Sequence, residues 1–367
     1  MHATPDGTQR FVQAQPEARR ANYRQTASHL WVSSVGLGTY LGHPDDATDS
    51  AYQEALTQAV ALGCNIIDCA INYRFQRSER AVGAWLVKAL AAGTVRRDEI
   101  VIATKGGFVP FDRELPADPG KWVHTNLIQN GLAHPNDFCA NYQHCIAPGY
   151  LEQMIAWSLH NLGVETIDIY YLHNPETQHI SLSHETFRAR MLDAFETLEQ
   201  AVERGQIASY GTATWTAYRA MPNTPDYLSL TEMVGMAVEV AGQDNHFKYV
   251  QLPYNLFMTE AFAFENQQLG ESFLSPIETA HELGLSVMIS APLHQGRLAN
   301  PLMPQLADVL TGLDTDAQRA IQFVRSSPGV TTALVGMKHA DHVAENLALM
   351  DLPTADGEII RGLYSQQ

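Results

Sequence analysis

The chain has few cysteines, few basic residues and no long apolar run, and each shortage excludes a class of protein. It contains 4 cysteines in 367 residues. These are too few and too irregularly spaced for a disulfide framework, so the reducing cytoplasm is the simplest location. Lys and Arg number 23 against 40 Asp and Glu, and the formal net charge is −17. This charge excludes general electrostatic attraction to nucleic acid or anionic membranes, although a local basic pocket for a phosphate is compatible with it.

No stretch reaches the roughly 18 apolar residues that a membrane-spanning helix needs. Residues 1–20 contain no apolar segment of the kind found in signal peptides. Hydrophobic residues nevertheless make up 45% of the chain, which is enough for a large core. The length allows one large domain or two, but no linker-like or low-complexity segment marks a boundary. We therefore expect one domain over residues 1–367, with about the first 30 residues peripheral.

Eight short apolar runs recur along the chain, and helical patterns separate them. Most of the runs are continuous rather than alternating, which is typical of strands covered on both faces. Helical stretches such as 51–63 and 148–163 end in Gly, a usual helix stop. Strands that alternate with helices predict βαβ units and a parallel sheet. The predicted strands are residues 33–40, 65–70, 100–107, 166–173, 207–214, 249–255, 285–292 and 331–336.

Eight such units match a single (β/α)8 TIM barrel of the α/β class, which needs about 250 residues. The surplus predicts long loop insertions after strands three and five, at about 111–147 and 217–248. We expect the first insertion to be an active-site lid. It contains cysteine and histidine, but their spacing matches no common zinc site, so we expect no metal. A doubly wound sheet is the alternative fold, but VGLGTYLG (35–42) lacks the GxGxxG spacing of its phosphate loop.

Four ionisable residues lie at the ends of three predicted strands. Asp68 and Tyr73 close the run NIIDCAINY, Lys105 closes IVIATK, and His173 closes TIDIYYLH. The carboxyl ends of barrel strands meet at one mouth, so these side chains should converge. An ammonium near a phenol lowers the phenol pKa from its usual value of about 10, and Asp68 would supply the counter-charge. We interpret the set as a proton-transfer centre in which Tyr73 is the general acid.

These segments resemble the aldo-keto reductase family from about residue 33 to 350. DCAINY is similar to the family element that carries its Asp and Tyr, with the same five-residue separation, and TKGG and YYLHNP match its lysine and histidine. The resemblance implies NAD(P)H-dependent reduction of an aldehyde or ketone, or the reverse reaction on an alcohol. It implies that the catalytic residues are Asp68, Tyr73, Lys105 and His173. The partner would be this small-molecule substrate, and the oligomeric state stays open.

The resemblance also implies how the cofactor is held. In YVQLPYN, Gln251 matches a glutamine that binds the nicotinamide amide and Tyr254 an aromatic ring beneath it. SAPLHQGRL (290–298) resembles the loop around the pyrophosphate. VGMKHADHVAENLA (335–348) resembles the adenosine segment, and a helix start at about Ala340 suits a phosphate. The implied cofactor contacts are Gly38, Thr39, Thr214, Gln251, Tyr254, Ala291, Pro292, Leu293, Gly296, Arg297, Gly336, Lys338, His339, His342, Glu345 and Asn346. The expected substrate-pocket residues are Tyr40, Phe108 and Asn174.

The chain departs from the family pattern at two points of the cofactor site, and it has Tyr40 where many relatives carry Trp. Many members have a Ser-Asn pair after strand five, but this chain has Ala213 and Thr214, so anchoring of the nicotinamide should depend more on Gln251. Lys338 and His339 stand where an arginine often marks NADP preference. Because lysine still binds phosphate as a point charge, we favour NADP(H) over NAD(H). Two other functions stay open, a cofactor-binding regulatory subunit and a barrel lyase that uses Lys105 as a Schiff base.

Overall fold

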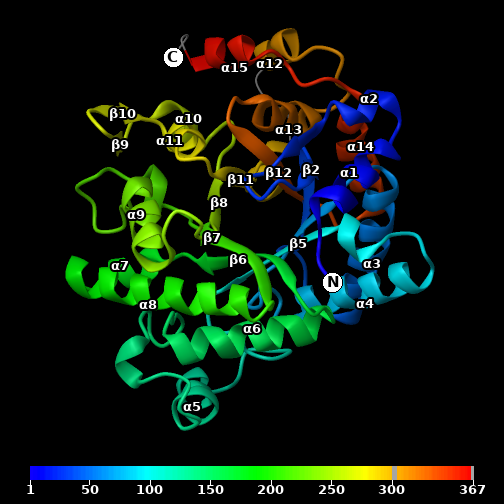
Figure 1. The fold of residues 1–367 in the computed structure, drawn as a ribbon. Helices are drawn as coiled ribbons and strands as arrows, with labels where there is room; N and C mark the ends of the chain where they lie inside the picture. The colour runs from blue at the N-terminus through cyan, green and yellow to red at the C-terminus, as the bar shows by residue number, and fades with distance from the viewer. Residues whose placement is uncertain (300–303, 365–367) are drawn as a thin grey trace.

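The computed structural model describes residues 1–299 and 304–364. Eight parallel strands form a closed barrel, in which the last strand pairs with the first (Figure 1). The predicted (β/α)8 barrel is confirmed, and each predicted strand overlaps one strand of the barrel. Most of the strand residues are buried, as their continuous apolar runs indicate. The barrel strands are β3 (Val35–Gly38), β4 (Ile66–Asp68), β5 (Val101–Gly106), β6 (Ile167–His173), β7 (Ile207–Ala213), β8 (Phe247–Pro253), β11 (Ser286–Ser290) and β12 (Val330–Gly336).

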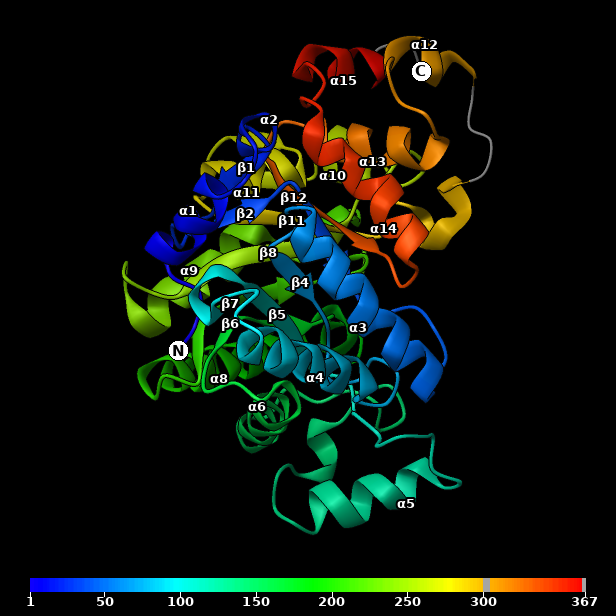
Figure 2. The same cartoon turned by 90° about the vertical axis from the view of Figure 1, so that its right-hand side faces the viewer.

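Helices cover the outside of the barrel (Figures 1 and 2). Local signals set their bounds: the Asp45 carboxylate accepts a hydrogen bond from the Thr48 N–H at one helix start, and Gly163, with φ of 65°, ends another. The outer helices are α3 (Asp46–Ala61), α4 (Arg77–Ala91), α6 (Pro148–Leu162), α8 (His184–Glu203), α9 (Leu230–Ala241), α11 (Pro276–Glu282), α13 (Asp316–Ser326) and α14 (Ala340–Leu347). The remaining labelled elements are α1 (Pro5–Gln13), α2 (Glu17–Arg20), β1 (Tyr23–Gln25), β2 (Trp31–Ser33), α5 (Pro119–Val123), α7 (Glu176–His179), α10 (Glu260–Ala263), β9 (Gln267–Leu269), β10 (Ser272–Leu274), α12 (Pro304–Val309) and α15 (Gly357–Tyr364).

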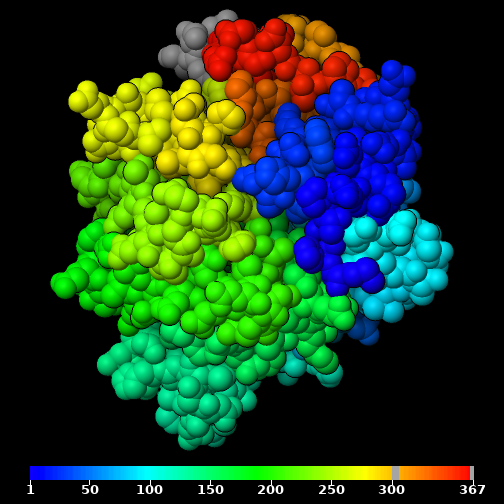
Figure 3. Space-filling view, viewed as in Figure 1, coloured from blue at the N-terminus to red at the C-terminus, as the bar shows by residue number. Residues whose placement is uncertain are grey.

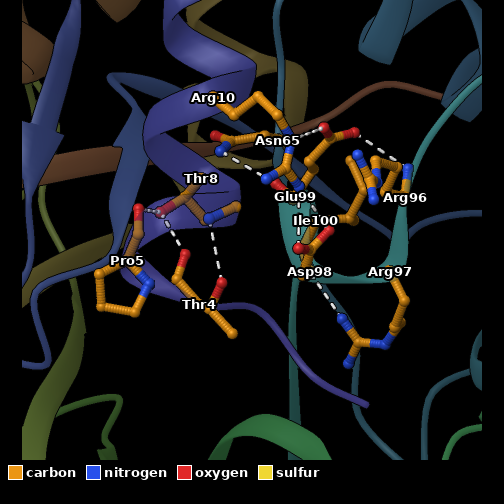
Figure 4. Close-up of polar contacts among 11 residues, drawn as sticks. Thr4, Pro5, Thr8, Arg10, Asn65, Arg96, Arg97, Asp98, Glu99 and Ile100 are labelled. Carbon is orange, nitrogen blue, oxygen red and sulfur yellow. Dashed lines mark hydrogen bonds and ion pairs between the residues drawn. The ribbon is translucent and has the colours of Figure 1, made fainter.

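The N-terminal segment closes one end of the barrel. Leu30 and Val32 join the apolar cluster inside the barrel, and the Ala3 N–H donates to Asp168 Oδ1 at 2.6 Å near the start of β6. Arg10 of α1 donates to the carboxylates of the turn that precedes β5 (Figure 4). Because these contacts are all made at the beginnings of the barrel strands, the opposite mouth, where the strands end, is left for function.

The predicted insertion at 111–147 stands out from the barrel beyond α6 (Figures 1, 2 and 3). Its returning end pairs with the extension of β5, where the Cys145 N–H donates to the Gly107 carbonyl at 2.9 Å. The predicted insertion at 217–248 includes α9, the outer helix of the fifth unit. The β9–β10 hairpin between β8 and α11 is a feature that the sequence patterns did not predict.

In the described part of the chain, no helix combines the length and the apolar character required to cross a bilayer.

Replacement of two helical glycines by alanine should change the free energy of unfolding in opposite directions. A Cβ on Gly83 in α4 would lie 2.4 Å from the Asn161 carbonyl oxygen of α6, whereas a Cβ on Gly235 in α9 would meet nothing within 4 Å. Gly83→Ala should therefore cost about 1–3 kcal/mol of unfolding free energy through overpacking. Gly235→Ala should add about 0.5–1 kcal/mol through helix propensity. Urea unfolding measures both changes, and the same sign for both would contradict the packing between α4 and α6.

Candidate active site

The barrel register brings the four predicted ionisable residues together at the mouth. Asp68 is the last residue of β4, Lys105 is the penultimate residue of β5, and His173 is the last residue of β6. Tyr73 lies in the turn that follows β4. Neighbouring strands pair Gly38 with Asp68 at this level, so each side chain reaches the mouth from a rigid strand end or the turn beside one.

A buried ion pair lies at the centre of the group. Lys105 Nζ donates to both oxygens of Asp68, at 2.8 and 2.7 Å, and to the Cys69 carbonyl at 2.8 Å. Gln251 Nε2 donates to Asp68 Oδ1 at 2.8 Å. Burial by itself lowers the pKa of Lys105, but the carboxylate of Asp68 and the phenol of Tyr73 together outweigh it and leave the pKa raised. The ammonium is therefore charged at neutral pH.

Tyr73 lies against this ammonium. Lys105 Nζ is 4.9 Å from the centre of the Tyr73 ring, and the ring of His173 lies edge-on to the phenol with centroids 5.9 Å apart. Burial raises the pKa of Tyr73 to about 12, although Lys105 lowers it. The expectation of a net lowered pKa was thus wrong, because it counted the charge of Lys105 and not the burial of the phenol. Tyr73 is a protonated donor at neutral pH.

His173 is a neutral imidazole. Burial lowers its pKa well below the ordinary value, and the nearby charge of Lys105 lowers it further. Its Nδ1 atom is buried and has no hydrogen-bond partner. A neutral ring beside a protonated phenol can donate or accept one hydrogen bond at an oxygen placed between them.

A single cavity of about 850 Å³ opens over these residues. It extends from Tyr73 to the start of α14, so one continuous space joins the proton-transfer group to the basic segment at 338–342. Most of the predicted cofactor and substrate residues line it, namely Gly38, Thr39, Tyr40, Phe108, Asn174, Thr214, Gln251, Ala291, Pro292, Leu293, Gly296, Gly336, Lys338, His339, His342, Glu345 and Asn346.

The far part of the cavity fits a nucleotide cofactor. Ala291 and Gln295, with φ of 51° and 57°, curve the loop after β11 around the space, and consecutive backbone N–H groups in such turns can bind anions. Helix α14 begins at Ala340, as predicted. Thr214 Oγ1 and Asn346 Oδ1 are buried polar atoms without a partner, and both residues line the cavity. Such orphaned atoms are what a bound polar ligand would satisfy.

Three predicted site residues do not line the cavity. Lys105 lies behind Asp68 and is completely buried. Arg297 lies beside His294, with their nitrogens 3.4 Å apart. The ring of Tyr254 packs 5.3 Å from that of Phe323 in α13. Its position does not match the predicted stacking role beneath a nicotinamide, because the side chain leaves the end of β8 toward the outer helices rather than the mouth.

Trp215 and Glu176 are among the residues of the site that the sequence did not predict. Trp215 follows β7 and lines the cavity. Glu176, three residues after His173, is buried and accepts hydrogen bonds from the Trp215 and Thr216 N–H groups at 2.7 and 3.2 Å. An aromatic and an acidic residue just beyond strand ends were the available signals. Glu176 holds the turn that presents Trp215 to the cavity.

The insertion at 111–147 contributes no residue to the cavity lining, so its role as a lid stays a prediction. Cys139 Sγ and His144 Nδ1 are 3.9 Å apart there. Within the described ranges, no group of three or more histidine, cysteine or acidic side chains is arranged to hold a metal ion.

Comparison with known proteins gives matches over most of the chain. The family model of the aldo/keto reductase family matches residues 34–364. The aldo-keto reductase yakc of Schizosaccharomyces pombe is 25% identical over 269 residues, which span 73% of this chain but only 60% of that protein. The 6-dehydroglucose reductase of Novosphingobium aromaticivorans is 24% identical over 331 residues, 87% of this chain and 86% of that protein.

A solved structure of similar fold is an aldo/keto reductase from Klebsiella pneumoniae in complex with NADP and acetate. It superposes with a TM-score of 0.61 at 20% identity and covers 94% of this chain and 95% of its own. At this identity the likeness supports the barrel fold.

The buried Glu176 should make stability depend on pH. Burial raises its pKa to about 7 from the ordinary 4.5, although the surrounding N–H groups favour the ionised form. The unfolded chain therefore ionises first, and stability falls as pH rises from 4.5 through 7. Glu176→Gln keeps an acceptor but has no proton to lose, so its stability relative to wild type should rise by about 1–3 kcal/mol between pH 5 and pH 8. Urea unfolding at both pH values tests this, with exposed Glu54→Gln as the matched control. An equal difference at both values would contradict it.

Proposed function

The chain belongs to the aldo/keto reductase family, and we propose that it reduces aldehydes or ketones with NADP(H), with Tyr73 as the general acid. The observation that carries the proposal is the geometry at the mouth. Tyr73 stays protonated beside a buried ammonium, next to a neutral imidazole, in one cavity with a basic far end. A regulatory protein without turnover would have no need to keep all four of these groups.

The choice of cofactor rests on the far end of the cavity. Lys338, His339 and His342 bring one ammonium and two imidazoles to the start of α14, which suits a phosphate group at a helix N-terminus. The name of yakc specifies NADP(+), and the Klebsiella pneumoniae enzyme was solved with NADP. Gln251 and Thr214 would hold the nicotinamide end, where Thr214 has an unpaired hydroxyl oxygen.

The proposed mechanism divides the work between cofactor and side chains. When bound, the cofactor supplies a hydride to the carbonyl carbon of the substrate. The hydroxyl of Tyr73 donates its proton to the carbonyl oxygen as that oxygen gains negative charge. Lys105 stabilises the phenolate that remains, and Asp68 keeps Lys105 charged and in place. Neutral His173 orients the carbonyl oxygen by a hydrogen bond.

The substrate side of the cavity is mainly aromatic. Tyr40 lies edge-on to Tyr73 with ring centroids 4.9 Å apart, and Phe108 and Trp215 line the same space. These rings offer apolar and stacking contacts to the part of the substrate that carries the carbonyl. Asn174 adds a polar side chain to the lining.

The cysteines support the predicted cytoplasmic location. All four are free, and all four are buried. Free thiols persist where disulfides are kept reduced.

Removal of the proposed acid should separate chemistry from binding. Tyr73→Phe keeps the ring but removes the only proton that it can donate, so the rate of NADPH oxidation with an active carbonyl should fall by about 100-fold or more. NADPH affinity, measured by fluorescence titration, should stay within a factor of about 3, because the change removes the proposed acid and leaves the proposed phosphate contact of Lys338 in place. Tyr40→Phe is the control, since it removes a phenol from the same space. If Tyr73→Phe reduced the carbonyl at the wild-type rate, Tyr73 would not be the general acid.

The cofactor is tested by titration with NADPH and, separately, with NADH. Wild-type protein should bind NADPH more tightly than NADH. Lys338→Ala should lower the affinity for NADPH by about 10-fold, because one charged contact to phosphate is lost. The affinity for NADH should change by much less. Lys88→Ala, an exposed lysine on α4, is the control for loss of one positive charge. Equal losses for both cofactors would place the 2′-phosphate elsewhere, and binding of neither would contradict the proposed function.

A further inference from the structure

His144, at the end of the insertion, reaches behind the active site. Its side chain is completely buried, and Nε2 lies 2.7 Å from the main-chain carbonyl oxygen of His173. On the other side of the ring, Nδ1 lies 3.2 Å from the amide nitrogen of Gln178. The amide can only donate to Nδ1, so the proton of the neutral ring must be on Nε2, which donates to the His173 carbonyl. Both hydrogen bonds therefore require one tautomer.

Gln178 is itself fixed. Arg190 of α8 donates to Gln178 Oε1 at 2.5 Å and to the Asp137 carbonyl at 3.1 Å. The guanidinium sets the orientation of the amide, because the amide oxygen must face Arg190 and the amide nitrogen must face His144. A continuous set of hydrogen bonds thus connects α8 through α7 and the insertion to the end of β6.

The backbone beside this contact is shaped to allow it. Gly107 has a φ of 151°, and a Cβ there would lie 2.7 Å from the His173 carbonyl oxygen and 2.9 Å from His144 Nε2. Any other residue would occupy the space in which the hydrogen bond forms. Phe108 follows, and its ring is edge-on to both histidines, with centroids 5.0 Å from each. His144 therefore touches two residues that line the cavity.

We propose that His144 is a positioning residue, which holds the ring of His173 and the ring of Phe108 where they meet the substrate carbonyl. The inference rests on the proposed function. It gives the insertion a role in the reaction, because the end of the insertion binds the main chain of His173 through His144. His144 touches neither the cavity nor the proposed acid. It acts by fixing the main chain at His173, and a displacement of about 1 Å at such a residue can cost about 100-fold in rate.

The test compares His144→Leu, which removes the donor, with His144→Gln, which returns an N–H group near the position of Nε2. His144→Leu should lower kcat by about 10- to 100-fold while the Kd for NADPH stays within about 2-fold. His144→Gln should recover kcat to within about 3-fold of wild type. His124→Leu, an exposed histidine of the same insertion, is the matched control and should leave kcat unchanged.

A second measurement needs no turnover. In ¹⁵N-histidine NMR spectra of the cofactor-free protein, the His173 ring signals should shift in His144→Leu and return in His144→Gln. A kcat within 2-fold of wild type in folded His144→Leu would overturn the proposal. So would a loss of kcat that His144→Gln fails to restore while its stability matches wild type. If no carbonyl is reduced by the wild-type protein, the proposed function fails on its own, and unshifted His173 signals would then overturn the positioning contact as well.

Discussion

The site depends on the ion pair between Asp68 and Lys105. A fully buried ammonium carries a desolvation penalty of several kcal/mol unless its charge and its three donors are all satisfied. Here two carboxylate oxygens and one main-chain carbonyl do so at 2.7–2.8 Å. Removing either partner would leave an uncompensated buried charge. The pair therefore requires β4 and β5 to keep their register, and the position of Tyr73 follows from it, because the phenol lies directly against the ammonium.

The barrel supplies the rigidity that this pair needs. Asp68 is hydrogen-bonded from β8 through Gln251, although β4 and β8 are not neighbours in the sheet. A side-chain bond across the mouth thus links two distant strands. The apolar cluster inside the barrel, which includes Ile66, Ile169 and Tyr249, lies beneath these polar groups. The polar groups are therefore supported by packed side chains rather than by water. Charge and packing therefore act together to hold the four side chains close to one another at the mouth.

The sequence predicted the strands and the convergence of the four ionisable residues well, since both follow from local patterns. Runs buried on both faces are apolar, and a polar residue that ends such a run is conspicuous. Three features could not be read in this way. The orientation of Tyr254 depends on its packing against Phe323 of α13, which is distant in the sequence. The raised pKa of Tyr73 depends on burial by residues from other strands. The contact of His144 with His173 joins the insertion to β6, and no spacing in the sequence indicates it.

The pKa of Tyr73 agrees with the proposed reduction at neutral pH. A phenol with a pKa of about 12 is protonated at pH 7, so in the proposed reaction Tyr73 would start as an acid and carbonyl reduction would need no prior ionisation. Oxidation of an alcohol would need the phenolate, which the burial of Tyr73 disfavours and only Lys105 stabilises. His173, with its lowered pKa, adds no positive charge that would help. The burial that outweighs Lys105 therefore keeps Tyr73 protonated in the resting protein, as the proposed reduction requires.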